Sequence, residues 1–161
     1  MLAQPSRSQF SIERQVQMAT PKVLTILLVE DDEGHAMLVQ MNLRYAGINN
    51  PIKHIDNGRE ALEYVKRLQT QDQASPLVVL LDINLPEIDG YTVLAQLKSE
   101  PKTRKVPVVV LTSTDDPNEI NRCYELGCNI FLRKPVDYPS FTNAIRQLGM
   151  FLAVVEIPDT E

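Results

Sequence analysis

The stretch "LVVLLDINLPEIDG" (Leu77–Gly90) decides the fold. Five apolar residues run directly into one carboxylate, Asp82, and a turn sequence follows that ends in Asp89-Gly90. A short apolar run rich in β-branched residues predicts a strand that is covered on both faces of its sheet. Such a strand buries its length and delivers Asp82 to the rim of the sheet. The function therefore depends on what else reaches that rim.

Four further segments have the character of strands. "VLTILLV" (23–29) and "VPVVVL" (106–111) are nearly continuous apolar runs, whereas "PIKHI" (51–55) and "NIFLR" (129–133) mix in more polar residues. Central strands of a parallel sheet are buried on both faces, so the two mixed segments suit the edges. The runs therefore predict a five-stranded parallel sheet with the strand order 2-1-3-4-5.

Helical patterns separate these strands. The stripe of Leu38, Met41 and Tyr45 predicts a helix over about 33–45, and Asp116-Pro117 predicts the capped start of another. Three more helices are expected, after Asn57-Gly58, from about 91 to 98, and after Asp137. Strictly alternating strands and helices imply right-handed crossovers with helices on both faces. We expect an α/β chain of the flavodoxin-like, doubly wound class.

Length, charge and cysteine content limit the possible classes of protein. The 161 residues carry a formal net charge of −5, which argues against nucleic acid or an anionic membrane as the main partner. No apolar run reaches the ~18 residues that span a bilayer. Cys123 and Cys128 lack zinc-site spacing and are interpreted as buried reduced thiols. We expect a cytoplasmic protein with one domain.

Polar residues follow all five expected strands, and those after the second strand, Asp56-Asn57-Gly58, are interpreted as a cap and turn. Three carboxylates, a hydroxyl and an ammonium converge at the rim where such sheets form their sites, from Glu30-Asp31, Asp82, Thr112 and Lys134. Crowded carboxylates repel one another, and the usual relief is a hard divalent cation such as Mg²⁺. A lysine and a threonine hydroxyl beside the cation would balance phosphoryl oxygens. The set suits an acyl phosphate on a carboxylate, and Asp82 is the best candidate to carry it.

Simpler interpretations stand beside this one. Acids also cap helices, and we assign Asp32 to the cap of the next helix. Taken alone, Thr112 and Phe131 fit core residues, and Lys134 fits an exposed strand end. The two histidines, His35 and His54, have no ligand spacing and are assigned to the surface.

At these positions the sequence resembles the receiver domain of bacterial two-component response regulators. The match covers about Val23 to Leu148 and consists of five motifs in order: Glu30-Asp31 after "ILLV", Asp82 in "LLDINLPEIDG", Thr112 in "VVVLTS", Phe131 in "NIFLRKP", and Lys134-Pro135. From the extent of this match we expect a receiver domain over 22–148, a flexible extension over 1–21 and a hydrophobic tail over 149–161. Met18 is an alternative start of translation.

The resemblance implies a role for each matched residue. Asp82 would accept phosphate from a sensor histidine kinase, and the Lys134 ammonium and Thr112 hydroxyl would hold the phosphoryl group. Phe131 would be the switch aromatic that moves inward on phosphorylation. Mg²⁺, for which Mn²⁺ can substitute, would be held directly by Asp31 and Asp82, through water by Glu30, and by the backbone carbonyl of Asn84. A cis peptide bond would precede Pro135.

The loops and tail resemble a narrower group, the small regulators that partner cyanobacterial phytochromes. The resemblance rests on "EPKTRKVPVVVLTSTDDPNEINRCYELGCNIFLRKPVDYPSF" and on "MFLAVVEIP". The expected kinase is therefore of the phytochrome type. The chain departs from this group in the tail, where Phe151-Leu152 stands in place of a tryptophan. An apolar tail either covers its own domain or forms a homodimer, for which the expected contacts are Phe141, Leu148, Phe151 and Leu152.

Two other functions are alternatives to a phospho-switch, one an enzyme and one a cofactor-binding protein. A haloacid-dehalogenase-type phosphatase needs a second acid two residues after its nucleophile, where this chain has Asn84. A flavin mononucleotide binder needs a phosphate-cradling loop after the first strand, where this chain has acids. We therefore expect a single-domain receiver that is not an enzyme and that signals through association with an unknown downstream protein.

Overall fold

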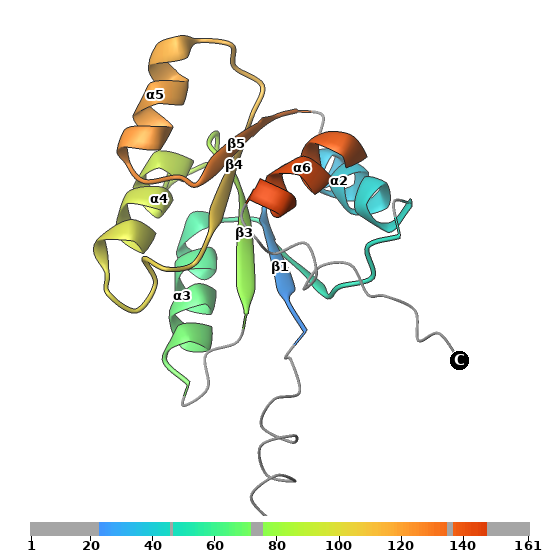
Figure 1. Cartoon of the computed structure of the whole chain (residues 1–161). Coiled ribbons are helices and arrows are strands. Elements are labelled where there is room, and N and C mark those ends of the chain that lie inside the picture. The colour runs from blue at the N-terminus through green and yellow to red at the C-terminus, as the bar shows by residue number, and fades with distance from the viewer. Residues whose placement is uncertain (1–22, 46, 72–75, 135–136, 148–161) are drawn as a thin grey trace, which may run out of the picture.

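The computed structural model describes residues 23–45, 47–71, 76–134 and 137–147, and it alternates strands with helices (Figure 1). The predicted extension (1–21), the tail (149–161), Pro135 and Leu148 lie outside the described residues. The strands are β1 (Thr25–Val29), β2 (Ile52–Ile55), β3 (Leu77–Asp82), β4 (Val108–Thr112) and β5 (Ile130–Arg133). The helices are α2 (Glu33–Tyr45), α3 (Gly58–Gln69), α4 (Gly90–Ser99), α5 (Pro117–Glu125) and α6 (Tyr138–Gln147).

The five strands form one parallel sheet in the order β2-β1-β3-β4-β5, which confirms the predicted topology. The strong apolar runs occupy the centre, since all residues of β3 and β4 are buried. The strand register brings the carboxyl ends level with one another. Asp82 lies opposite Leu111, and the next residue, Thr112, lies opposite Arg133. The polar residues after the strands are therefore delivered to one edge.

Helices cover both faces of the sheet, as predicted (Figure 1). Side chains alternate along a strand, so β3 contributes Val79 to one core cluster and Val78 to the other. The first cluster contains buried residues of α3, α4 and α5, and the second contains those of α2 and α6. Phe141 of α6 is completely buried in the second cluster. Its predicted role as a homodimer contact is wrong, because a side chain without exposed surface cannot touch a second chain.

Several helix starts follow from their capping residues. Asn57 accepts a hydrogen bond from the Glu60 amide at 2.9 Å, and Asp89 accepts one from the Thr92 amide at 2.8 Å. Asp32 accepts from the His35 amide at 2.9 Å, as the cap interpretation of Asp32 predicted. The short polar side chains thus fix where each helix begins.

The apolar stripe that predicted α2 faces away from the core. Ala36, Val39 and Leu43 are the buried residues of the helix. Leu38, Met41 and Tyr45 are exposed, with Tyr45 at 95% of its full accessible surface. The helix was predicted correctly from its period, but the stripe of large side chains does not mark the side that packs on the sheet.

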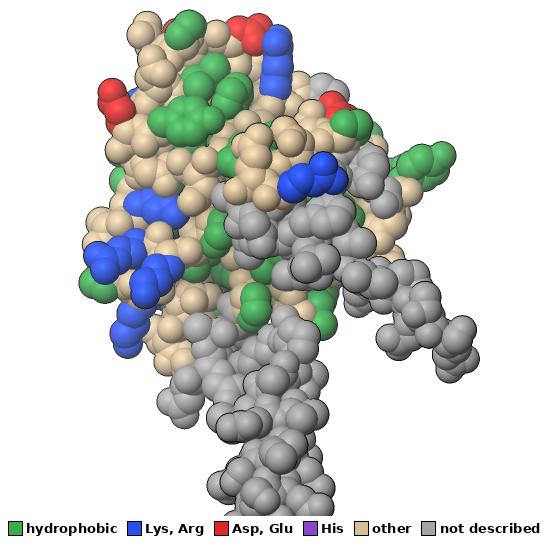
Figure 2. All heavy atoms as spheres, viewed as in Figure 1, with side chains coloured by type: hydrophobic (Ala, Val, Ile, Leu, Met, Phe, Trp, Pro, Cys, Tyr) green, Lys and Arg blue, Asp and Glu red, His purple; other side chains and the backbone are tan. Residues whose placement is uncertain are grey.

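Basic side chains gather at the opposite end of the molecule from the acidic rim. Figure 2 shows Lys and Arg side chains over the ends of α3 and α4, where Lys66, Arg67, Lys102, Arg104 and Lys105 are exposed. Cations are favoured there because the carboxyl ends of helices carry partial negative charge. The net negative charge of the chain thus coexists with a locally basic surface.

None of the helices in the described ranges is long and apolar enough to cross a membrane.

Candidate functional site

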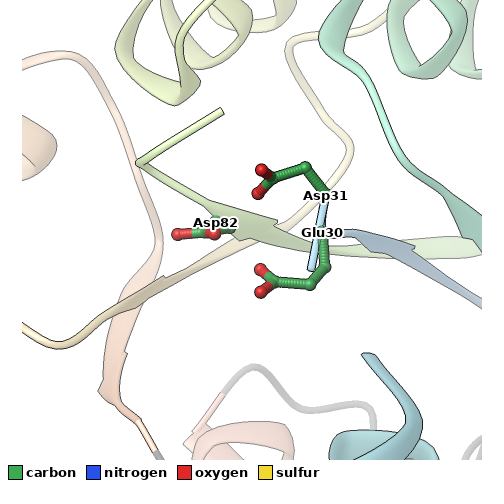
Figure 3. Close-up of side chains that lie close together, drawn as sticks. All are labelled: Glu30, Asp31 and Asp82. Carbon is green, nitrogen blue, oxygen red and sulfur yellow. The ribbon is translucent and has the colours of Figure 1, made fainter. Parts of the chain in front are cut away.

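The ends of β1 and β3 bring three carboxylates together. Glu30 follows β1, and its amide donates to the Ile55 carbonyl at 3.1 Å, which extends the pairing with β2 by one step. Asp82 is the last residue of β3. One carboxylate oxygen each from Glu30, Asp31 and Asp82 lies within 4.8 Å of the others. Figure 3 shows the three carboxylates around a common space.

The three acids differ in their access to solvent. Glu30 and Asp82 are buried, at 1% and 3% exposure, whereas Asp31 is exposed. Oδ1 of Asp82 accepts a hydrogen bond from the Asn84 amide at 3.1 Å, which orients the carboxylate. The site is therefore buried on the side of Glu30 and Asp82 and open to solvent at Asp31.

Lys134 contributes a positively charged side chain to this site. Its Nζ lies 3.0 and 3.1 Å from the two oxygens of Glu30 and 3.1 Å from Oδ2 of Asp82. Its backbone amide donates to the Thr112 carbonyl at 2.9 Å, so the end of β4 holds the lysine backbone in place. The ammonium thus bridges two carboxylates. Without it, burial and mutual repulsion would disfavour the charged form of both groups.

The protonation of these groups reflects their burial and coupling. Burial, with a hydrogen bond to Asp82, raises the pKa of Glu30 from 4.5 to about 7, although Lys134 opposes this shift. Burial alone would raise the pKa of Asp82, but its hydrogen bonds with Glu30 and the Asn84 amide, together with Lys134, lower it. Burial likewise works against the charged lysine, yet Glu30 and Asp82 raise the pKa of Lys134. Asp82 is therefore the ionised member of the buried pair.

Thr112 and Phe131 come from the two strands beyond Asp82. Thr112 is buried at the end of β4, and its Oγ1 accepts from the Thr114 amide at 3.1 Å. Phe131 lies opposite Val110, is partly buried, and packs against the cluster on the α3, α4 and α5 side. The structure thus places Thr112 beside the acidic rim and Phe131 lower on the adjacent edge strand.

Two histidines contact Glu30; both were predicted at the surface, and the structure places His35 there but leaves His54 half-buried. His35 Nδ1 lies 3.0 Å from Oε1 of Glu30 while the ring remains exposed. His54 Nε2 lies 2.8 Å from the backbone oxygen of Glu30. The strand register could have indicated His54, because β2 pairs in parallel with β1 and His54 lies opposite Leu28. For His35 the sequence offers a weaker indication of this contact, which is its position in the first turn of the helix that follows Glu30.

The donor set fits a hard divalent cation. Carboxylate oxygens are the ligands that Mg²⁺ and Mn²⁺ accept, and a Mg²⁺ site needs only one or two carboxylates because several waters complete it. Three acids, one of them exposed, meet that need. The neighbouring ammonium and hydroxyl also suit the oxygens of a phosphoryl group.

Known proteins resemble this chain in both sequence and structure. The model of the response regulator receiver domain matches residues 26–146. The response regulator Rcp1 of Synechocystis sp. is 33% identical over 140 residues, which cover 86% of this chain and 94% of Rcp1. The structure of its Mn²⁺-bound form aligns with a TM-score of 0.62 and 34% identity, over 86% of this chain and 99% of that one.

Two other solved structures are also similar. A receiver domain from Rhodospirillum rubrum is 47% identical with a TM-score of 0.65, and the match covers 85% of this chain and 99% of that domain. The bacteriophytochrome response regulator AtBRR is 36% identical with a TM-score of 0.73, and the match covers 88% of this chain and all of AtBRR. The alignments therefore span nearly the whole length of each relative.

Proposed function

This chain belongs to the response regulator receiver domain family, and we propose that it is a phospho-switch that accepts a phosphoryl group on Asp82 from a sensor histidine kinase. One observation carries the assignment to Asp82. Its buried carboxylate lies 3.1 Å from the Lys134 ammonium and shares one space with Glu30 and Asp31. An ionised, oriented carboxylate with a fixed cation beside it is suited to nucleophilic attack on phosphorus.

In the proposed reaction an oxygen of Asp82 attacks the phosphorus of a phosphohistidine. The O–P bond forms, the P–N bond breaks, and the imidazole leaves with the bonding pair and takes a proton from solvent. The Lys134 ammonium and the Thr112 hydroxyl then face the new phosphoryl oxygens. Their positive charge and hydrogen-bond donation stabilise the acyl phosphate.

A divalent cation completes this site in the proposal. Asp31 and Asp82 would bind Mg²⁺ or Mn²⁺ directly, Glu30 through water, and Asn84 through its backbone carbonyl. When bound, the cation supplies positive charge that offsets the repulsion between the carboxylates and the incoming phosphate. The acidic cluster and the Mn²⁺-bound form of Rcp1 support this assignment.

The proposed output is a change in association with another protein. An added phosphoryl group carries about −1.5 to −2 charges and strong acceptor oxygens. Thr112, once bonded to that group, would shift its loop, and Phe131 would move inward on the same edge. The downstream protein stays unidentified, and the homodimer prediction now depends on Leu148, Phe151 and Leu152 alone.

We propose a phytochrome-type kinase as the phosphate donor. Similarity to AtBRR, a bacteriophytochrome response regulator, and to the phosphorylated cyanobacterial phytochrome response regulator RcpA supports this choice. The test is phosphotransfer from a phytochrome kinase compared with an unrelated histidine kinase. Equal initial rates from the two kinases would argue against the phytochrome assignment.

Intact mass after incubation with acetyl phosphate and Mg²⁺ tests the central proposal. We expect the wild-type chain to gain one phosphoryl group and Asp82→Asn to gain none. Asp32→Asn is the matched control, because Asp32 is an exposed acid that caps α2, and it should still be phosphorylated. Modification that persists in Asp82→Asn would refute the assignment of the acceptor.

A further inference from the structure

The ends of α3 and α4 that lie away from the acidic rim carry a cluster of positively charged side chains (Figure 2). Five exposed residues form this cluster, which we call the basic surface: Lys66, Arg67, Lys102, Arg104 and Lys105. The Lys66 ammonium lies 3.2 Å from a carboxylate oxygen of Glu100, the residue that follows α4. This ion pair joins the end of α3 to the loop after α4, so the five cations belong to one continuous surface.

Most of the charge on the basic surface is not neutralised by the chain itself. Among the residues that the structure describes, Lys102, Arg104 and Lys105 form no ion pair. Glu100 pairs with Lys66, and Glu63 adds a second acid one turn earlier on α3. The basic surface is therefore locally positive, although the whole chain has a formal net charge of −5.

The loop after α4, which carries three of the five cations, is held by its own hydrogen bonds. Oγ1 of the buried Thr103 donates at 2.7 Å to a carbonyl in the last turn of α4. The Arg104 amide donates to the Glu100 carbonyl at 2.9 Å, and the Lys98 ammonium donates to the Arg104 carbonyl at 3.1 Å. A loop that is already ordered loses little backbone entropy when a partner binds to it.

We propose that the basic surface binds a short, extended acidic segment of a partner protein. Carboxylates complement its charge, and a guanidinium such as that of Arg67 or Arg104 can hold a carboxylate through two parallel hydrogen bonds. The guanidinium carbon of Arg67 lies 5.5 Å from the centroid of the Tyr64 ring, a cation–π contact that restricts the arginine before binding. The surface thus combines unpaired charge with side chains and a loop that are positioned in advance.

Nucleic acid and anionic membranes match this surface less well than a short acidic segment does. Both are extended polyanions that reach beyond the basic surface and meet the acidic remainder of the chain. Single-stranded nucleic acid also stacks its bases on aromatic rings, but the Tyr64 ring is partly buried and already contacts Arg67. Membrane-binding surfaces add apolar anchors. In the described part of the chain, no large exposed hydrophobic side chain lies on α3, α4 or the loop after α4.

A partner bound at the basic surface leaves the acidic rim accessible. α4 begins beside the end of β3, where the Gly90 amide donates to the Ile83 carbonyl at 2.9 Å. From there its ten residues extend about 15 Å towards the basic surface. This length is about twice the distance of ~8 Å over which physiological salt screens a charge. A change of charge at Asp82 should therefore alter the affinity of the basic surface by less than about twofold.

Fluorescence anisotropy with a fluorescein-labelled hexaglutamate peptide tests the proposal. The full chain is used without phosphorylation, so the result does not depend on the assignment of Asp82 as phosphoacceptor. We expect saturable binding at about 50 mM KCl that weakens severalfold at about 300 mM, because salt screens the charges. The affinity of Asp82→Asn should lie within about twofold of the wild-type value, and a larger change would contradict the separation of the basic surface from the rim.

Charge reversal identifies the surface that binds the peptide. Lys102→Glu combined with Arg104→Glu should weaken binding by about tenfold or more, because attraction becomes repulsion. Lys53→Glu combined with Arg59→Glu is the matched control. It changes the net charge equally at exposed positions outside the basic surface, and it should weaken binding by less than about twofold. Denaturant unfolding checks that both variants are folded.

Four results would overturn the proposal. Absence of saturable peptide binding, or equal losses in the two charge-reversal variants, would show that the basic surface does not recognise acidic segments. Tighter binding of a fluorescein-labelled thymidine hexanucleotide than of the peptide would assign the surface to nucleic acid. Sedimentation of the wild-type chain with vesicles of phosphatidylserine and phosphatidylcholine, lost in Lys102→Glu with Arg104→Glu, would assign it to a membrane.

Discussion

The Lys134 ammonium lies 3.1 Å from Oδ2 of Asp82, at the carboxyl edge of the sheet. The same nitrogen lies 3.0 Å from Oε2 of Glu30, and the lysine side chain is only 15% exposed. The lysine therefore occupies a position in which it neutralises buried carboxylates in the cation-free protein. A divalent cation bound as proposed would have to share these oxygens with the lysine.

Replacing Lys134 with Ala should consequently have two opposite effects. Without divalent cations, the unfolding free energy should fall by about 1–3 kcal/mol, because Glu30 and Asp82 lose a buried partner. The apparent affinity for Mg²⁺ should rise, because the competing charge is gone. Denaturant unfolding in EDTA and calorimetric Mg²⁺ titration measure the two effects. Lys102→Ala, at an exposed lysine far from the rim, is the control, and equal results for the two variants would contradict the competition.

The raised pKa of Glu30 makes stability depend on pH. Its carboxyl titrates at about 7 in the folded chain, against 4.5 as the ordinary value, chiefly because it is buried. Between these two values the folded state binds more protons than the unfolded state, so the unfolding free energy falls as pH rises through this window. We expect a loss on the order of 2 kcal/mol from pH 5 to pH 8 in EDTA.

Glu30→Gln provides the control for this pH dependence. An amide does not titrate, so the variant should lose most of the slope between pH 5 and pH 8. The lowered pKa of Asp82 acts below its ordinary value of 3.8 and does not overlap the window. An equal slope in wild-type chain and variant, measured by denaturant unfolding, would show that another group titrates there.

Much of the fold could be predicted because burial on both faces leaves a clear pattern in the sequence. β3 and β4 read as apolar runs, and the mixed composition of β2 and β5 placed them correctly at the edges. The apolar stripe of α2 did not indicate which side of the helix packs on the sheet. A helical period indicates a helix, but small Ala36 and branched Val39 pack on the sheet here, and the larger Met41 remains outside.

The candidate site was predictable where residues directly follow strands. Glu30, Asp82 and Lys134 meet because parallel strands end at one edge, and the topology sufficed to bring them together. The contact of His35 with Glu30 depends on a rotamer and on the exit angle of α2, which no local pattern encodes. Whether these residues accept phosphate stays a prediction for the phosphorylation experiment.

The ion pair between Arg133 and Asp115 should contribute little to stability despite its short distance. Their closest atoms are 2.6 Å apart, but both side chains are more than 60% exposed, at 62% and 68%. Solvent screens such pairs, and ordering the long arginine side chain costs entropy, so Asp115→Ala should change the unfolding free energy by no more than about 1 kcal/mol. Denaturant unfolding at low and high salt measures this. A larger loss that salt abolishes would show a stronger electrostatic role.

Gly90 fixes the position of the backbone at Asp82, the proposed phosphorylation site. The sequence pattern indicated only a turn at Gly90. Its amide donates to the Ile83 carbonyl at 2.9 Å, and a Cβ at this position would lie 2.4 Å from the Asp82 carbonyl oxygen and 2.5 Å from Cα of Ile83. Both are backbone atoms and cannot rotate away. A side chain here must therefore push the start of α4 from the end of β3.

Gly90→Ala should thus lower the unfolding free energy by about 1–3 kcal/mol, since overpacking of this kind forces backbone shifts. It should also slow phosphorylation by acetyl phosphate, because Asp82 moves relative to Lys134. Gly34→Ala is the matched control: its Cβ would lie 3.2 Å from an exposed Asp32 oxygen, and alanine favours the helix. Unfolding and intact-mass kinetics on both variants measure the effects. If Gly90→Ala matched Gly34→Ala in both, the close approach of Gly90 to Asp82 would not position the acceptor.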